Sequence, residues 1–111
     1  MKLSYHCEYY RAERVQKIID TVGLGQIVAK KYFHSMNDIL NGKPGTYTCI
    51  TDTGVTMICS EDMETIITVY ITTYKELLNV YNGEKKIPPY LKKKVNQNQA
   101  YFIRNGKTFL R

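Results

Sequence analysis

The alternation of apolar and polar positions is clearest between Thr65 and Thr73, where nearly every side chain is β-branched or aromatic. Such side chains fit a pleated surface, and neither glycine nor proline interrupts the segment, so the pattern predicts a β-strand. Side chains alternate between the two faces of a strand. One face then carries an apolar row for the core, formed by Ile67, Val69 and Ile71. The other face is either a solvated surface or the floor of a site, and it carries Ile66, Thr68, Tyr70 and Thr72.

A helical period occupies segment 4–22 at the start of the chain. Ser4 is suitable as an N-cap, and Gly23 or Gly25 can end the helix. At about 100° per residue, one stripe becomes the expected buried face, and it contains Cys7, Val15, Ile18, Ile19 and Val22, with Arg11 in its middle. An i, i+4, i+8 ladder beside this stripe is formed by His6, Tyr10 and Arg14. A second, short helix is predicted over 25–33.

The middle of the chain alternates with a period of two and is divided by short turns rich in Gly, Asp and Asn. The predicted strands are a weak one at 36–40, followed by 46–51, 55–59 and 65–73. Short connections make neighbouring strands antiparallel, so these segments predict a meander of three or four strands. We expect the two leading helices to cover one of its faces.

The last third of the chain returns to a helical pattern. A helix is predicted over 74–81, ended by Asn82-Gly83, and a basic helix from about Tyr90 to Phe102, followed by a turn at Asn105-Gly106. The prediction is therefore a single α+β domain, residues 1–111. It has an α+β core at 4–84 and a basic carboxy-terminal extension at 85–111.

Length and cysteine content favour a protein of the cytoplasm. At 111 residues the chain is long enough to bury a core without disulfide bonds. Its three cysteines are an odd number without a CxxC pair, which argues against a disulfide framework and a zinc site and favours a reducing compartment. The amino terminus lacks the apolar run of a signal peptide, and no segment approaches the roughly 20 apolar residues that span a bilayer.

Positive charge is concentrated at the carboxy-terminal end. The net charge is +6, but residues 85–111 contain eight basic residues and no acid, whereas residues 1–84 contain eight basic and ten acidic residues. A basic segment of this kind gains affinity for a polyanion by releasing counterions, and it also serves as a solvated tail. The residues that we expect to contact nucleic acid are Arg11, Lys85, Lys86, Lys92, Lys93 and Lys94.

Most motifs of catalytic chemistry find no support. Asp52-Thr53-Gly54 matches the aspartic-protease triplet, but it also fits a hairpin loop, and no apolar-Gly segment follows it to support a catalytic loop. The glycine spacing fits no phosphate-binding loop. His6 and His34 are far apart and the acids are not clustered as in magnesium sites, so we expect neither metal nor cofactor. No Gly-x-Ser-x-Gly elbow supports a serine triad.

Two short motifs resemble a known superfamily. The pattern His-x4-Arg-x2-Arg, formed by His6, Arg11 and Arg14, begins the chain, and Ile-Ile-Thr-Val-Tyr lies in the last predicted strand. With two helices before a meander, they resemble the small metal-independent ribonucleases of the barnase, EndoU, colicin and RelE superfamily, whose phage and prophage members often have comparable length. The resemblance covers residues 4–73 and leaves out the basic carboxy-terminal third.

This resemblance implies a ribonuclease toxin that cleaves RNA by attack of the 2'-hydroxyl on the adjacent phosphate. The reaction needs a base, an acid and fixed cations near the phosphorane. The resemblance implies proton transfer by His6, phosphate binding by Arg14 and Arg11, and hydrogen bonds to phosphate from Thr68 and Tyr70, whose ring also stacks on a base. The implied partners are RNA, in the ribosome or as tRNA, and an inhibitor protein.

A second interpretation stays open, namely a non-catalytic phage or mobile-element protein. Such a protein binds nucleic acid or blocks a host complex through its basic segment. Ten tyrosines and no tryptophan suit a binding surface as well as a core, so composition does not separate the two interpretations. They differ in whether His6 and Arg14 converge with Thr68 and Tyr70 around one cleft.

Overall fold

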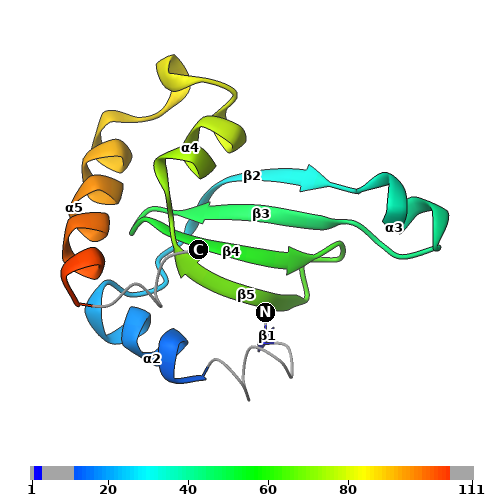
Figure 1. Cartoon of the computed structure of the whole chain (residues 1–111), viewed down its shortest axis with the longest axis horizontal. Coiled ribbons are helices and arrows are strands. Elements are labelled where there is room, and N and C mark those ends of the chain that lie inside the picture. The colour runs from blue at the N-terminus through cyan, green and yellow to red at the C-terminus, as the bar shows by residue number, and fades with distance from the viewer. Residues whose placement is uncertain (1, 4–11, 106–111) are drawn as a thin grey trace.

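A computed structural model describes residues 2–3 and 12–105 and shows an α+β fold built on one sheet (Figure 1). The described elements are, in chain order, β1 (Lys2–Leu3), α2 (Ala12–Thr21), β2 (Ile27–Phe33), α3 (Met36–Leu40), β3 (Thr46–Thr51), β4 (Val55–Ser60), β5 (Thr65–Ile71), α4 (Tyr74–Tyr81), the 3-10 helix η1 (Glu84–Lys86) and α5 (Pro89–Asn105). Within this part of the chain, no helix is long and apolar enough to cross a membrane.

The sheet contains an antiparallel meander of the four strands β2 to β5, of which β3, β4 and β5 correspond to the predicted strands 46–51, 55–59 and 65–73. Its strand order is β1-β5-β4-β3-β2, with β2 at one edge. The short strand β1 pairs in parallel with the start of β5, where Lys2 faces Thr65. The sequence did not predict β1, because two residues are too few to show an alternation.

Two predicted elements before β3 are wrong in type. Segment 25–33, predicted as a helix, contains strand β2, in which exposure alternates along the chain and not with a helical period. Its β-branched and aromatic residues favour a strand once β3 is available to pair with it. Segment 36–40, predicted as a weak strand, is helix α3, because the Ser35 side chain accepts a hydrogen bond from the Asp38 N–H (3.0 Å) and caps it.

As a result, one described helix, and not two, precedes the meander. Helix α2 forms the second half of the predicted helix 4–22, and residues 4–11 lie outside the described part of the chain. Val15 and Ile18 are buried, as their stripe predicted, whereas Ile19 is 40 % exposed at the edge of that stripe.

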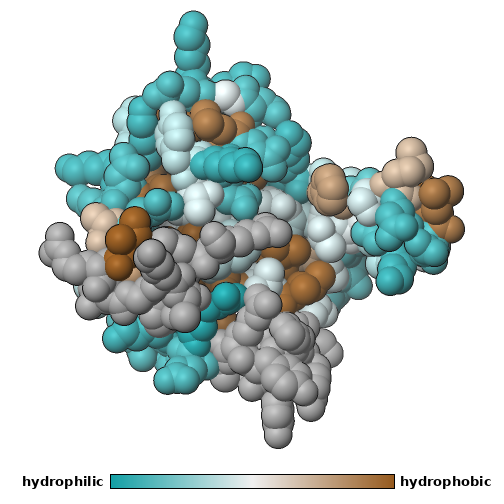
Figure 2. Space-filling model, in the orientation of Figure 1, coloured by the Kyte–Doolittle hydropathy of each residue, from teal (hydrophilic) through white to brown (hydrophobic). Residues whose placement is uncertain are grey.

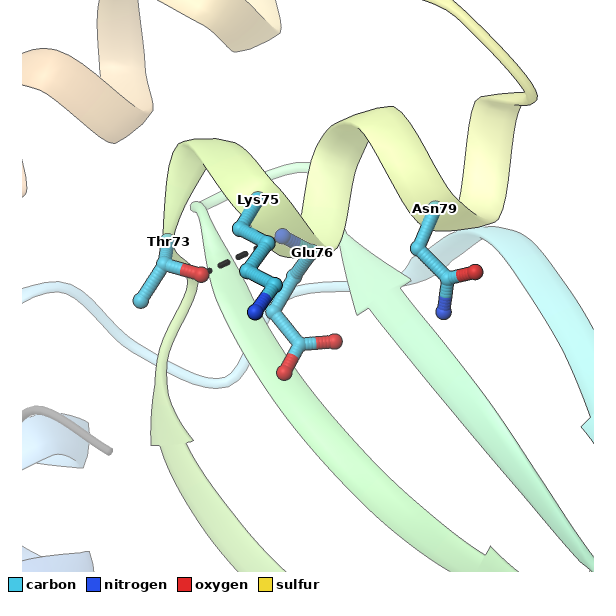
Figure 3. A pocket seen from close by; sticks show the side chains of 4 residues that line it. All are labelled: Thr73, Lys75, Glu76 and Asn79. Carbon is cyan, nitrogen blue, oxygen red and sulfur yellow. Dashed lines mark hydrogen bonds between the residues drawn. The ribbon is translucent and has the colours of Figure 1, made fainter.

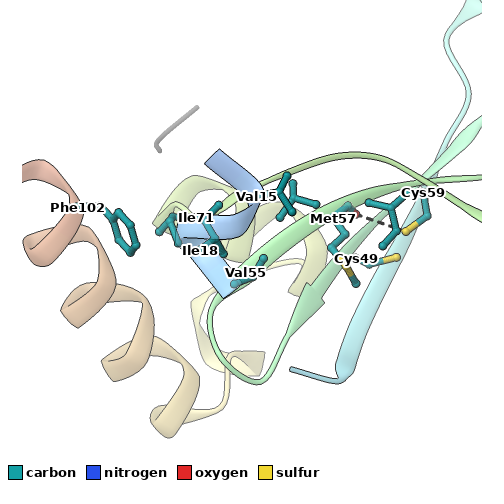
Figure 4. Packing of buried hydrophobic residues seen from close by; sticks show 10 residues of the cluster. Val15, Ile18, Cys49, Val55, Met57, Cys59, Ile71 and Phe102 are labelled. Atoms are coloured by element: carbon teal, nitrogen blue, oxygen red, sulfur yellow. Dashed lines mark hydrogen bonds between the residues drawn. The ribbon is translucent and has the colours of Figure 1, made fainter. Parts of the chain in front are cut away.

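The two faces of the sheet carry separate apolar clusters. Helix α2 packs Val15 and Ile18 on the first face, against a cluster that includes Val55, Met57, Val69 and the free cysteines Cys49 and Cys59 (Figure 4). Helix α4 covers the second face, where the cluster contains Ile50, Leu77, Val80, Ile87, Leu91 and Val95. Each face of the sheet thus has a core of its own.

A β-bulge in β5 changes which side chains enter the first cluster. Ile58 pairs with Thr68, but the next residue, Cys59, pairs with Ile66, so Ile67 is the extra residue. Ile66 therefore joins the buried cluster in place of Ile67, which the alternation had assigned to the core.

Helix α5 contacts both clusters. It stands at one end of the sheet (Figure 1), where Phe102 packs in the first cluster while Leu91 and Val95 pack in the second. These three side chains are fully buried. The described part of the predicted basic extension is therefore integrated into the core, because α5 has one apolar face in addition to its lysines.

Asp52-Thr53-Gly54 forms the loop of the β3–β4 hairpin. Of the two interpretations of this triplet, the structure therefore has the hairpin loop. The Asp52 carboxylate accepts a hydrogen bond from the Gln26 N–H (3.0 Å), and the Thr53 hydroxyl donates to the Gly23 carbonyl (2.7 Å). Gly54 has a φ of 80°, which suits glycine. This loop therefore holds the start of β2 against the end of β3.

An arm formed by the ends of β2 and β3 and by α3 projects from the opposite end of the sheet from α5 (Figure 1). None of the five residues of α3 is buried, and large apolar side chains are exposed on the arm at Phe33, Met36, Ile39 and Leu40. Figure 2 shows an apolar patch at the end of this arm.

Hydrogen bonds fix the base of the arm. The Tyr32 hydroxyl donates to the Glu61 carboxylate, which also accepts from the Gly45 N–H (2.9 Å). His34 lies beside them, with its Nδ1 atom 3.3 Å from the Tyr32 hydroxyl and its Nε2 atom 2.7 Å from the Lys43 carbonyl. The Tyr32 hydroxyl and the Gly45 N–H lower the pKa of Glu61, and the carboxylate raises the pKa of Tyr32.

This network predicts an acid-dependent loss of stability. The pKa of Glu61 in the folded protein lies below its ordinary value of 4.5. Glu61 therefore contributes to the stability of the folded state above pH 4.5, and this contribution is lost as the pH falls through the lowered pKa. Glu61→Gln is expected to flatten the fall of Tm on acidification below pH 4.5, measured by circular dichroism. Glu64→Gln in the same loop is the control. Equal acid dependence in both variants would contradict the role of Glu61.

Candidate functional site

The candidate site lies on the second face of the sheet, beyond the part that the apolar cluster under α4 occupies. Register pairs Lys31 with Thr48, Thr48 with Ile58 and Ile58 with Thr68, so one row crosses all four strands from β2 to β5. Paired residues point to the same face of a sheet. We call this set the cross-strand row; it carries an ammonium group at one end and hydroxyl groups along its length.

Arg14 extends the row at its β5 end. Its Nη2 atom donates a hydrogen bond to the Thr68 hydroxyl (3.1 Å), and both side chains are half-buried. Its helix neighbour Val15 packs on the first face of the sheet, so the Arg14 side chain passes the β5 edge to reach Thr68. A guanidinium in this position presents fixed donors that match a phosphate or a carboxylate.

A cleft of ≈ 560 Å³ opens over the β2 end of the row. It lies between the sheet and α4, and its lining combines hydroxyl, amide, carboxylate and ammonium groups with aromatic and aliphatic carbon. The lining residues are Lys31, Tyr32, Phe33, Thr46, Thr48, Ile58, Glu76 and Asn79. Ile58 belongs to both the cleft and the row, and Thr68 is its partner on β5, so the cleft leads towards Arg14.

Among the described residues, helix α4 contributes the only carboxylate that lines this cleft, that of Glu76. The Tyr70 hydroxyl donates a hydrogen bond to Glu76 Oε1 (2.9 Å), which ties the carboxylate to β5. The backbone of Glu76 is fixed as well, because its N–H donates to the Thr73 hydroxyl at the N-cap of α4 (3.2 Å). Thr73, Lys75, Glu76 and Asn79 line a second hollow of ≈ 580 Å³ beside α4, and Figure 3 shows these four side chains.

Lys31 fixes the other end of α4. Its ammonium group donates to the Asn79 carbonyl (3.0 Å), the Asn79 side chain (3.3 Å) and the Asn82 side chain (3.1 Å). A cation is favourable at a helix carboxy terminus because of the helix dipole. Lys31 therefore positions α4 over the cleft, and its charge is already partly compensated there.

The structure brings together some of the predicted catalytic residues. Arg14 and Thr68 are in contact, and Tyr70 follows on the same face of β5. Tyr70 is only 2 % exposed, so its ring cannot stack on a base as the resemblance implied. His6 and Arg11 lie outside the described residues. The structure therefore gives Tyr70 a position behind Glu76 rather than on the surface.

The predicted nucleic-acid-binding lysines lie on η1 and α5. Lys85, Lys86 and Lys93 are exposed. Lys92 forms an ion pair with Glu84 (2.6 Å), and its ammonium lies 5.7 Å from the centre of the Tyr74 ring. Lys94 is half-buried. The exposed three are accordingly more accessible to a ligand than the other two.

Sequence reasoning missed Glu76, Lys31 and Thr48. Thr73-x-x-Glu76 is the capping-box spacing, which marks a helix start, but the contact of this carboxylate with Tyr70 depends on the α4–β5 packing. Lys31 lies in segment 25–33, which the sequence predicted as a helix, and the strand observed there places it in the cross-strand row.

The described residues contain no group of three or more His, Cys, Asp or Glu side chains placed to hold a metal ion. Comparison with protein-family models gives no match for this chain. Searches of curated proteins and of solved structures give no match either. The candidate function therefore rests on the geometry of the site and on the motifs of the sequence.

Proposed function

We propose that the chain is a metal-independent endoribonuclease that cleaves RNA at the Arg14 end of the cross-strand row. The observation that carries the proposal is the Arg14–Thr68 hydrogen bond of 3.1 Å, which joins side chains 54 residues apart in the sequence. It puts a guanidinium and a hydroxyl on the sheet face that also carries the Tyr70–Glu76 pair. Cation, hydroxyl and carboxylate are the groups that transesterification of RNA requires.

In the proposed reaction, Arg14 and Thr68 donate hydrogen bonds to the non-bridging oxygens of the scissile phosphate. The Glu76 carboxylate takes the proton of the 2'-hydroxyl, whose oxygen attacks phosphorus. His6 gives a proton to the departing 5'-oxygen as its bond to phosphorus breaks. Tyr70 positions Glu76 through the hydrogen bond of 2.9 Å. The products are a 2',3'-cyclic phosphate and a 5'-hydroxyl.

This proposal predicts cleavage without a divalent ion. Purified protein is expected to cut an end-labelled RNA in EDTA, because arginine supplies the positive charge that a metal supplies elsewhere. Gel analysis with and without phosphatase and acid treatment measures the product ends, and cyclic phosphate is expected. A DNA strand of the same sequence lacks the 2'-hydroxyl and is the control. Cleavage of DNA, or 3'-hydroxyl products from RNA, would contradict the mechanism.

A non-catalytic nucleic-acid-binding protein is the second candidate. The observation that favours it is the exposure of Lys85, Lys86 and Lys93 on η1 and α5. Binding that falls steeply with salt, together with intact RNA at every protein concentration, would support this second function over the first.

A further inference from the structure

The outer face of α5 combines exposed tyrosines with lysines and amides. Tyr90 is 53 % exposed and Tyr101 is 43 % exposed. At about 100° per residue, Lys94 and Gln97 fall between these tyrosines within about 60° of each other around the helix axis. The buried face of the helix carries Leu91, Val95, Asn98 and Phe102, and it is centred about 100° around the axis from this stripe.

Spacing along the helix suits an extended strand. Eleven residues separate Tyr90 from Tyr101, which at 1.5 Å per residue puts their Cα atoms about 16 Å apart. Successive nucleotides of an extended single strand are roughly 6 Å apart, so this distance corresponds to about three nucleotides. The helix is therefore long enough to present two stacking platforms to one strand.

A shallow hollow of ≈ 580 Å³ runs beside these residues on the same helix. It is lined by Pro89, Lys92, Lys93, Asn96, Gln97 and Ala100. The carbon surfaces of a proline and an alanine lie beside amide and ammonium groups, a combination that suits the flat faces and polar edges of bases.

The charged side chains of α5 are all basic. The sequence has no acid from Lys85 to Asn105, and Lys93 is exposed about 40° around the helix axis from Gln97. Lys92 is paired with Glu84, so its charge is partly compensated, and Lys93 carries the stronger attraction for a phosphate chain.

We propose that the outer face of α5 binds single-stranded nucleic acid, with phosphates at Lys93 and Lys94 and unpaired bases against Tyr90 and Tyr101. Bases of a duplex are stacked on one another and cannot stack on a tyrosine, so the surface selects unpaired strands. This binding goes beyond the proposed cleavage and does not require it, because Tyr90, Lys93, Lys94 and Tyr101 belong neither to the cross-strand row nor to the lining of its cleft.

Fluorescence anisotropy with labelled oligonucleotides of about 12 nucleotides tests the proposal. The probes are oligo(dT), which a ribonuclease cannot cleave, oligo(U), and a duplex of equal length. The expected result is tighter binding of both single strands than of the duplex. Tighter binding of oligo(U) than of oligo(dT) identifies RNA as the ligand, and equal affinity for the two means that the surface binds both single-stranded RNA and single-stranded DNA. Equal binding of duplex and single strands would overturn the proposal.

Variants separate stacking from charge. Tyr90→Ala with Tyr101→Ala is expected to weaken oligo(dT) binding about 10- to 100-fold, whereas the two Tyr→Phe changes retain affinity because the rings remain. Lys93→Gln with Lys94→Gln is expected to reduce the slope of log affinity against log salt by about 1.4, and Lys75→Gln on α4 is the charge control. Unchanged affinity in the double alanine variant, with native circular dichroism, would overturn the stacking role.

This experiment is distinct from the test of cleavage. Oligo(dT) binding that depends on the tyrosines, together with intact RNA, would reject the Arg14 mechanism and keep the α5 surface. Cleavage of RNA without tyrosine-dependent binding would reject the α5 surface and keep the mechanism.

Discussion

Replacing Arg14 with alanine is expected to lower the rate of RNA cleavage by about 10²- to 10³-fold, the usual cost of removing one fixed donor to a developing charge. The side chain is held by Thr68 at 3.1 Å and is half-buried, so its guanidinium is oriented before substrate binds. Most of the loss is expected in kcat, because the negative charge on phosphate increases in the transition state. Single-turnover cleavage measured in EDTA gives this comparison.

Two variants control for charge and for geometry. Lys17→Ala removes an exposed cation from the same helix and is expected to leave the rate within about threefold, because surface charge acts mainly on encounter. Arg14→Lys keeps the charge but loses the planar fork, and an intermediate rate is expected. If Arg14→Ala and Lys17→Ala reduce cleavage equally while both stay folded, Arg14 has no special place in the reaction.

His6 provides an independent check on the same mechanism. If it protonates the leaving oxygen, His6→Ala loses cleavage of RNA, but a substrate whose leaving group needs no proton is still cleaved. His34→Ala is the matched control, because its imidazole lies at the base of the arm.

Phe102→Ala is expected to destabilise the protein by about 3–5 kcal/mol, the usual cost of deleting a large buried aromatic side chain. Phe102 is fully buried in the cluster that α2 and β5 share, and no other described residue of α5 belongs to that cluster. Urea unfolding followed by circular dichroism measures the effect. A loss of this size would show that the end of α5 is a structural part of the domain.

The neighbouring residue supplies the control for this measurement. Ile103 is 55 % exposed, and Ile103→Ala is expected to change the free energy of unfolding by less than about 0.5 kcal/mol. Similar small effects at both positions would mean that the carboxy-terminal part of α5 contributes little to the core, as expected for an appended basic helix.

The strands β3, β4 and β5 and helix α4 could be predicted because their patterns are local. Alternation over six or seven residues and the Thr73 N-cap depend on neighbours in sequence. Segments 25–33 and 36–40 were misassigned because short apolar runs fit either period, and in the first of them pairing with β3 favours the strand. The parallel pair β1–β5 and the bulge at Ile67 depend on contacts that a local pattern does not contain.

The candidate site was predictable only in part, for a related reason. Thr68 and Tyr70 were visible as one face of a strand, and Arg14 as a residue at the edge of a helical stripe. The contact between Arg14 and Thr68 depends on the packing of α2 against β5. The burial of Tyr70 depends on α4, which lies above it. Glu76 was not predicted as a site residue, because its spacing from Thr73 gives no information on β5.

Strand β2 at the sheet edge offers backbone groups to which a neighbouring molecule can add another strand. Lys30 and Lys31 occupy its middle, so a second copy aligned antiparallel on this edge would bring like charges face to face. The Lys31 ammonium is also tethered to α4 and cannot easily swing away. Among the described strands, β2 is a long strand with a neighbour on one side only, and its two lysines therefore disfavour extension of the sheet by a second copy.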